Sequence, residues 1–235
     1  MSTEARRVQL QDSLNRTREA IADACERAGR PRDAVRLVVV TKTFPALDAA
    51  TLVELGQADL GENRDQEAAP KAAELARRGL EPVWHFVGQL QRNKARSVAA
   101  YADWVHSVDR ASLADALDKA AAAHGRRLSA LVQVSLDGDT ARGGVAAADV
   151  EPLAAHLASL DSIDLKGVMA VAPIGWDPAK AFALLAESSA AVRRVDPAAT
   201  EVSAGMSGDF REAVAGGATM VRLGRNVLGE REPMA

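Results

Sequence analysis

Short apolar runs alternate with longer amphipathic stretches along almost the whole chain. The apolar runs are rich in β-branched residues, as in Leu-Val-Val-Val at 37–40, which is typical of strands buried on both faces of a parallel sheet. They predict strands at 37–42, 58–61, 83–88, 104–108, 128–136, 163–171, 200–204 and 218–223. Apolar residues at helical spacing predict helices at 4–28, 46–56, 64–78, 92–101, 110–124, 147–160, 177–195 and 209–215.

This alternation predicts an α/β fold in which each strand is followed by a helix. Eight such steps favour a closed (β/α)8 TIM barrel, with a doubly wound open sheet as the main rival. The helix at 4–28 precedes the first strand and is therefore an addition to the barrel. It either completes the outer ring of helices or supports a dimer contact. We expect one domain over residues 1–235, without a second domain after the last strand.

Lys42 is the first candidate for chemistry. It follows the first apolar run where the strand is expected to end, and Pro45 prevents that strand from continuing. An ammonium beside an apolar layer is unfavourable unless it is paired, deprotonated or held in a covalent bond.

Two glycine-rich loops follow the seventh and eighth predicted strands. They are Gly-Met-Ser-Gly at 205–208 and Gly-Arg-Asn at 224–226. Barrels of this class often bind phosphate in these two loops, because glycine lets backbone N–H groups approach an anion closely. Either loop alone is more often an ordinary turn. Together, in a barrel whose first strand ends at a lysine, they predict a phosphate site.

Composition narrows the class of partner. The net charge of -3 and an aromatic content of 3% argue against nucleic acid, which requires basic surfaces and stacking platforms. The chain contains neither a signal peptide pattern nor an apolar run long enough to span a membrane. Cys25 is the only cysteine, which excludes an internal disulfide. We expect a cytoplasmic protein.

A lysine and a phosphate site in one barrel mouth suggest a Schiff base with a phosphorylated carbonyl compound. Pyridoxal phosphate and a sugar phosphate, as in an aldolase, both fit this description. Arg222 precedes Gly224 by two residues and so shares its face of the last strand. In a pyridoxal phosphate site this arginine would face the ring nitrogen, whereas its ordinary role in a barrel would be an ion pair with a neighbouring strand.

Several segments together resemble the pyridoxal phosphate homeostasis protein family, also known as YggS or PROSC. They are VVVTKT, LGEN, WHFVGQLQRNK, GVMAVAP, SAGMSGDF and VRLGRNVLG, in the same order from about residue 8 to residue 230. Any one segment is a weak signal, whereas the WHFVGQLQRNK block and the GMSGD block together are specific. The resemblance implies a fold like the barrel domain of alanine racemase.

The resemblance also implies a role for individual residues. Lys42 matches the lysine that holds the cofactor as an internal aldimine, and Arg222 matches the arginine at the pyridine nitrogen. The other matching positions bind the phosphate or lie near the cofactor: Asn63, Ser207, Gly208, Gly224 and Arg225. His85 stays outside this set, since a histidine between Trp84 and Phe86 on a strand is more often a hydrogen-bonded core residue.

Three positions depart from the pattern usual in the family. Phe44 stands where many relatives have a second lysine, Arg64 where many have tyrosine, and Arg142 where a lysine is usual. These changes put in doubt a second cofactor site or a handover role for those side chains. Arg142 keeps the charge but does not form a Schiff base.

The residues favour a cofactor carrier over a robust enzyme. A permanently cationic Arg222 should leave the ring nitrogen unprotonated and weaken the cofactor as an electron sink. Catalysis on an amino acid also needs acid/base groups at the site. Tyr101, the only tyrosine, is expected on the face of the barrel away from the site. We therefore expect a monomer that holds pyridoxal phosphate on Lys42 and supplies apo-enzymes. The alternatives are an enzyme with weak racemase activity and a Schiff-base aldolase.

Overall fold

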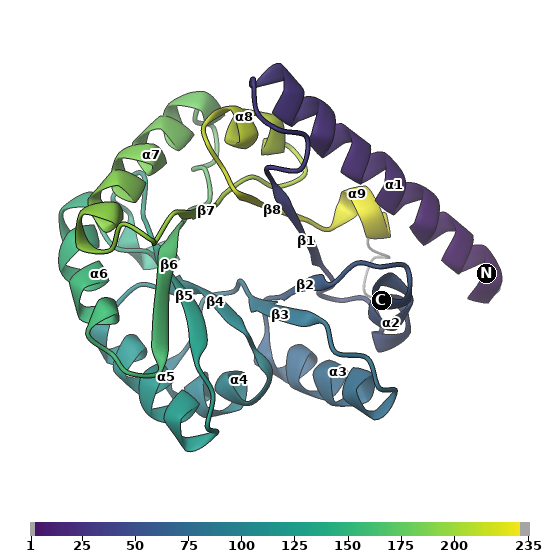
Figure 1. Cartoon of the computed structure of the whole chain (residues 1–235), viewed down its shortest axis with the longest axis horizontal. Coiled ribbons are helices and arrows are strands. Elements are labelled where there is room, and N and C mark those ends of the chain that lie inside the picture. Colours follow the sequence, from purple (N-terminus) through teal and green to yellow (C-terminus); the bar gives the residue numbers. More distant parts are fainter. Residues whose placement is uncertain (1–2, 231–235) are drawn as a thin grey trace.

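A computed structural model of the chain describes residues 3–230. Their parallel strands pair in sequence order and close into a barrel, because β8 pairs with β1 (Figure 1). The strands are β1 (Arg36–Val40), β2 (Asp59–Glu62), β3 (Val83–Phe86), β4 (Trp104–Val108), β5 (Leu128–Gln133), β6 (Ile163–Met169), β7 (Glu201–Ser203) and β8 (Met220–Leu223). The predicted (β/α)8 TIM barrel is confirmed.

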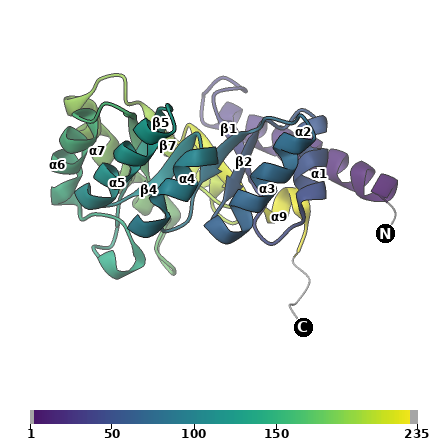
Figure 2. The ribbon, with the colours of Figure 1, turned by 90° about the horizontal axis from the view of Figure 1, so that it is seen from below.

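Helices form the outer layer of this barrel. They are α1 (Thr3–Arg27), α2 (Ala46–Glu54), α3 (Asp65–Arg77), α4 (Ala95–Tyr101), α5 (Ala111–Ala123), α6 (Val150–Ala158), α7 (Pro178–Val195), α8 (Phe210–Ala215) and α9 (Arg225–Leu228). Figure 2 shows α3, α4 and α5 covering the outside of the strands. The short helix α9 was not predicted, because a single turn is too short for helical periodicity to be visible.

Several strands, β1 among them, end earlier than the apolar runs suggest. β1 ends at Val40, so Lys42 lies in the turn that follows it rather than in the strand. Thr43 has φ +69°, the left-handed conformation, and this reverses the chain direction immediately after Lys42. Lys42 is therefore carried by a tight turn at the carboxyl end of the barrel.

The helix α1 completes the ring. It packs against α8, α9 and α2, and Figure 1 shows it along the outside of β8 and β1. Its buried face carries Leu10, Leu14, Ile21 and Cys25 at helical spacing. Of the two roles that the sequence left open for this helix, the structure shows the first.

Two apolar clusters fill the space between strands and helices. One joins α1, β1 and β2 to the last strand, and the other joins β4, β5 and β6 to α4–α7. Within residues 3–230, no helix combines the length and apolar composition needed to cross a bilayer.

Candidate functional site

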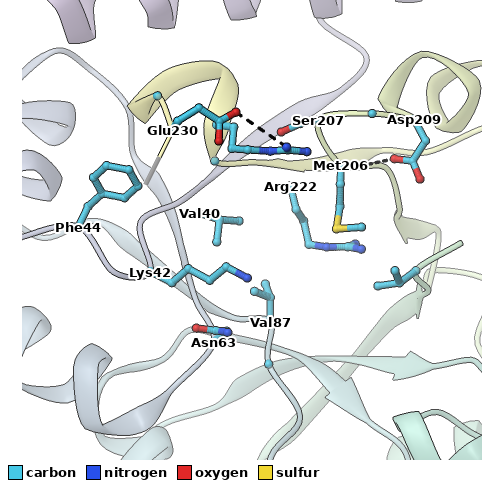
Figure 3. A pocket seen from close by; sticks show the side chains of 16 residues that line it. Val40, Lys42, Phe44, Asn63, Val87, Met206, Ser207, Asp209, Arg222 and Glu230 are labelled. Atoms are coloured by element: carbon cyan, nitrogen blue, oxygen red, sulfur yellow. Dashed lines mark hydrogen bonds and ion pairs between the residues drawn. The ribbon is translucent and has the colours of Figure 1, made fainter. Parts of the chain in front are cut away.

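A cavity of about 760 Å³ opens at the carboxyl ends of the strands, which is the usual position of active sites in this fold. Its volume suits a ligand the size of a cofactor. All seven residues predicted for the site line it (Figure 3): Lys42, Asn63, Ser207, Gly208, Arg222, Gly224 and Arg225. The structure thus brings together residues that come from both ends of the chain.

Lys42 reaches into this cavity from the turn after β1. It is half-buried, and Figure 3 shows its side chain extending into the same space as Arg222, with Asn63 beside it. The apolar side chains of Val40, Val87 and Val171 also line the cavity. The arrangement offers an amine next to a region that is apolar enough for a flat ring.

Two side chains of α3 hold the backbone on either side of Lys42. The Lys71 ammonium donates to the carbonyl of Thr41 at 2.9 Å and is paired with Glu62. Glu67 Oε2 accepts a hydrogen bond of 2.9 Å from the N–H of Thr43. These contacts stabilise the left-handed turn and so set the position of Lys42.

Glu62 is the centre of this support. Its Oε1 also accepts a hydrogen bond of 2.6 Å from the Thr41 hydroxyl, and both Glu62 and Lys71 are almost fully buried. Burial raises the pKa of Glu62, and the Lys71 ammonium opposes that shift. The sequence analysis assigned no role to either residue, although Glu62 falls in the LGEN segment. Lys71 falls on the apolar face of α3 with Ala68, Ala72 and Leu75, a position where a lysine needs a partner.

The loop between β7 and α8 contributes Ser207 and Gly208. Gly205 allows the loop to turn at φ +90°, and a Cβ there would lie 2.7 Å from Ala213 Cβ. Asp209 Oδ1 accepts a hydrogen bond of 2.6 Å from the Met206 N–H, which fixes the next turn (Figure 3). A Cβ on Gly208 would meet no atom within 4 Å, so the space at this backbone is open to a ligand.

The second glycine loop lies directly after β8. A Cβ on Gly224 would lie 3.0 Å from the Val40 carbonyl oxygen, so glycine allows β8 and β1 to approach closely here. Arg225 is exposed and lies 3.9 Å from Glu230. The two loops therefore border one part of the cavity with backbone N–H groups, the Ser207 hydroxyl and a guanidinium.

Arg222 is a buried cation that faces the cavity from β8. Its Nη1 donates to Ser203 Oγ at 2.6 Å and its Nη2 donates to the Ala170 carbonyl at 2.9 Å. Burial lowers the pKa of Arg222 to about 10, and Asp209 opposes this shift. The ion pair with a neighbouring strand, which is the ordinary role of such an arginine, is replaced here by two neutral acceptors.

Asn63 follows β2 and depends on a glycine of the next loop. A Cβ on Gly88 would lie 2.1 Å from the Asn63 carbonyl oxygen, so only glycine permits the observed approach. This contact fixes Asn63 at the cavity wall.

The three positions that depart from the family pattern have different surroundings. Phe44 lines the cavity, and its ring lies 5.8 Å from the Arg6 guanidinium. Arg64 is exposed and pairs with Glu67 at 3.8 Å. Arg142 is exposed in the loop after β5, where it pairs with the carboxylates of Asp137 and Asp139.

The donor set fits a phosphorylated aromatic aldehyde. One cavity is lined by the Lys42 amine, the Arg222 guanidinium and two glycine-rich loops. Apolar side chains line the same cavity. The open space at Gly208 would accommodate an anion, and the backbone there needs no side chain to move first.

Comparison with known proteins agrees with this geometry. Residues 13–232 match the family described as alanine racemase, N-terminal domain. A protein of Mycobacterium tuberculosis named "Pyridoxal phosphate homeostasis protein" is 42% identical, covering 96% of this chain and 94% of that protein. The structure of PipY from Synechococcus elongatus, which has PLP bound, is 37% identical with a TM-score of 0.78, covering 89% of this chain and 100% of PipY.

A more distant likeness concerns the fold alone. Alanine racemase from Corynebacterium glutamicum superposes with a TM-score of 0.67 at 14% identity, covering 92% of this chain and 60% of the racemase. The barrel, the converging residues and the extent of these matches lead to one conclusion: the chain belongs to the pyridoxal phosphate homeostasis protein family, whose barrel is of the alanine racemase N-terminal type.

Proposed function

We propose that this chain binds pyridoxal phosphate in the cavity at the carboxyl ends of β1 and β8, attached reversibly to Lys42, and takes part in intracellular pyridoxal phosphate homeostasis. The observation that carries the proposal is the convergence of Lys42, Arg222 and the two glycine loops on one cavity. A relative 42% identical bears the homeostasis name, and PipY holds PLP.

Each lining residue has a part in holding this cofactor. Pyridoxal phosphate supplies an aldehyde that condenses reversibly with a primary amine, releasing water. Lys42 provides the amine, while Ser207, Gly208 and the Gly224–Arg225 backbone bind the phosphate. Arg222 donates to the ring nitrogen, and Asn63 borders the ring.

The same residues favour storage over catalysis. Arg222 is a cationic donor and so opposes protonation of the ring nitrogen, which weakens electron withdrawal. Racemisation also needs acid/base groups beside the cofactor. The ring of Tyr101 packs edge-on against Trp84 at 6.5 Å in the outer layer of the barrel, so this tyrosine does not serve as such a group. In this proposal the protein acts in the cytoplasm as a monomer and releases its cofactor to apo-enzymes when another amine displaces Lys42.

A second candidate is a pyridoxal phosphate enzyme with weak racemase activity on a small amino acid. The likeness of its barrel to that of alanine racemase favours it. Steady racemisation of alanine that disappears in Lys42→Ala would establish this activity. A rate no higher than that of pyridoxal phosphate in buffer would exclude it.

Absorption spectroscopy tests the proposed function directly. We expect wild-type protein to acquire a near-visible band with pyridoxal phosphate, and borohydride to bleach this band and leave the label on Lys42. Lys42→Ala should form no such band, while Lys119→Ala, an exposed lysine of α5, serves as the matched control. Absence of the band in wild-type protein would overturn the proposal. A colourless protein that borohydride traps with a sugar phosphate would be an aldolase.

A further inference from the structure

A continuous chain of hydrogen bonds crosses the interior of the barrel and ends at Arg222. Asp59 Oδ1 lies 2.9 Å from His85 Nε2, and His85 Nδ1 lies 2.9 Å from His106 Nε2. His106 Nδ1 lies 2.9 Å from Ser203 Oγ, which in turn accepts from Arg222 Nη1 at 2.6 Å. These side chains come from β2, β3, β4, β7 and β8.

When both imidazoles are neutral, the two ends of this hydrogen-bond chain determine the direction of every bond in it. A guanidinium only donates and an ionised carboxylate only accepts. With both imidazoles neutral, the ionised Asp59 requires the proton on His85 Nε2, and Ser203 Oγ, which accepts from Arg222, donates its own proton to His106 Nδ1. His106 must then carry its proton on Nε2 and donate to His85 Nδ1, and His85 Nε2–H donates to Asp59.

Burial keeps the two imidazoles in this state. His85, His106 and Ser203 are almost completely inaccessible to solvent. Burial lowers the pKa of His106 well below its ordinary value, and the cations of Arg222 and Arg36 lower it further. Burial also lowers the pKa of His85, against the opposing effect of Asp59.

The surroundings contain few other charges. Asp103 and Arg36 act on His85, and Asp209 acts on Arg222. Arg36 also lies 3.9 Å from Asp59, and the imidazole of His85 stacks on Trp104 at 5.6 Å. A protonated histidine in this chain would face Arg222 across one hydroxyl and would leave the Ser203 proton without the acceptor that the structure gives it.

We propose that His85 and His106 are positioning residues for Arg222, forming a one-way hydrogen-bond chain from the guanidinium to Asp59 that fixes the orientation of Arg222 toward the cavity. The inference rests on the proposed function, in which Arg222 donates to the ring nitrogen of the cofactor. The Ala170 carbonyl holds one amino group of Arg222, and the chain holds the other.

Loss of the chain would allow the guanidinium to rotate about its remaining contact. A donor that is not preorganised binds its acceptor less well. The ring nitrogen of the bound cofactor would then be open to protonation as the pH falls. His106 therefore influences the cofactor through Ser203 and Arg222, without touching it.

The first experiment uses the unmodified protein. The protein has four histidines, so long-range ¹H–¹⁵N NMR spectra of the imidazoles are simple to assign. We expect His85 and His106 to be neutral at pH 7 and both to carry their proton on Nε2. Observation of either ring as charged, or protonated on Nδ1, would overturn the chain whether or not the protein binds pyridoxal phosphate.

The second experiment tests the effect on the cofactor. Ser203→Ala and His106→Leu both break the chain, whereas the amide oxygen of His106→Asn can still accept from Ser203. We expect the first two to weaken pyridoxal phosphate binding about tenfold, the loss of one hydrogen bond to a charged group. Their bound-cofactor band should become pH-dependent between about pH 5 and 8, and His106→Asn should restore part of the wild-type behaviour.

The controls separate the possible failures. His156→Leu removes a partly exposed histidine of α6 that contacts Asp115, and it should leave affinity and spectrum unchanged. If Ser203→Ala folds and retains the affinity and pH profile of the wild type, the positioning role is wrong. If His106→Leu does not fold, the affinities and pH profiles of Ser203→Ala and His106→Asn decide whether the positioning role is correct. Failure of wild-type protein to bind the cofactor contradicts the proposed function instead. The imidazole spectra then still test whether the hydrogen-bond chain exists.

Discussion

The Lys71 ammonium donates a hydrogen bond of 2.9 Å to the backbone carbonyl of Thr41, the residue immediately before Lys42. The same ammonium pairs with Glu62, so one buried lysine of α3 joins the ends of β1 and β2. The position of the turn that carries Lys42 therefore depends on a helix residue outside the cavity lining.

Replacement of Lys71 by methionine should destabilise the protein strongly. It leaves the buried Glu62 carboxylate without its cation and removes the donor to Thr41, and breaking a buried ion pair in this way costs about 3–5 kcal/mol. Denaturant unfolding measures the free energy. Lys119→Met, at an exposed position of α5, is the matched control and should change it by less than about 0.5 kcal/mol.

The loss of unfolding free energy in Lys71→Met should also depend on pH. Burial already raises the pKa of Glu62, and removal of the ammonium raises it further. A carboxyl whose pKa is higher in the folded state binds protons more tightly there, so its contribution favours folding at low pH and declines as pH rises. The difference from wild type should therefore be smaller at pH 5 than at pH 8, and a difference that is equal at both would contradict this account.

The buried histidines should make the whole protein less stable in acid. The pKa values of His85 and His106 lie below the ordinary value of 6.5, so below that pH the unfolded chain binds protons that the folded chain does not. The free energy of unfolding should fall by about 1.4 kcal/mol per pH unit for each histidine. His106→Asn should reduce this slope by one histidine's share, and an unchanged slope would show that His106 is not the group responsible.

Two glycine substitutions should separate binding from stability. Gly208→Ala adds a methyl group where no atom lies within 4 Å, so we expect unchanged unfolding and about tenfold weaker pyridoxal phosphate binding. Gly88→Ala places a Cβ 2.1 Å from the Asn63 carbonyl oxygen, so it should reduce both the free energy of unfolding and the affinity for pyridoxal phosphate. Paired denaturation and cofactor titrations measure the two effects, and wild-type affinity in Gly208→Ala would remove this loop from the phosphate site.

The inner face of α1 should matter for folding but not for assembly. Leu14, on the inner face of α1, is fully buried, so Leu14→Ala should cost about 2–5 kcal/mol in unfolding free energy. Val8, on the same helix, is 52% exposed, and Val8→Ala should be nearly neutral. Light scattering should give the mass of a monomer for all three proteins. A dimer in wild type that dissociates in Val8→Ala would show that the outer face of α1 is an interface.

The barrel and its cavity residues follow from local features of the sequence. Strand and helix periods are properties of neighbouring residues, and closure of parallel strands brings all their carboxyl ends to one face. Lys42, Ser207 and Gly224 each lie just after a strand, so their convergence required only the strand order. Arg222 follows from the alternation of strand side chains, because it shares a face with Gly224, whereas Asn63 was indicated by the family resemblance.

The supporting contacts were decided by the tertiary structure. Lys71 reaches Thr41 only because α3 packs against β2 beside the end of β1, and no spacing in the sequence encodes that contact. His106 meets Ser203 across the barrel interior at a separation of 97 residues, where strand stagger determines which inward side chains lie at the same level. Local patterns thus determined which residues face the cavity. The packing of distant strands and helices determined what holds those residues in place, because buried polar groups must find partners wherever the fold brings them together.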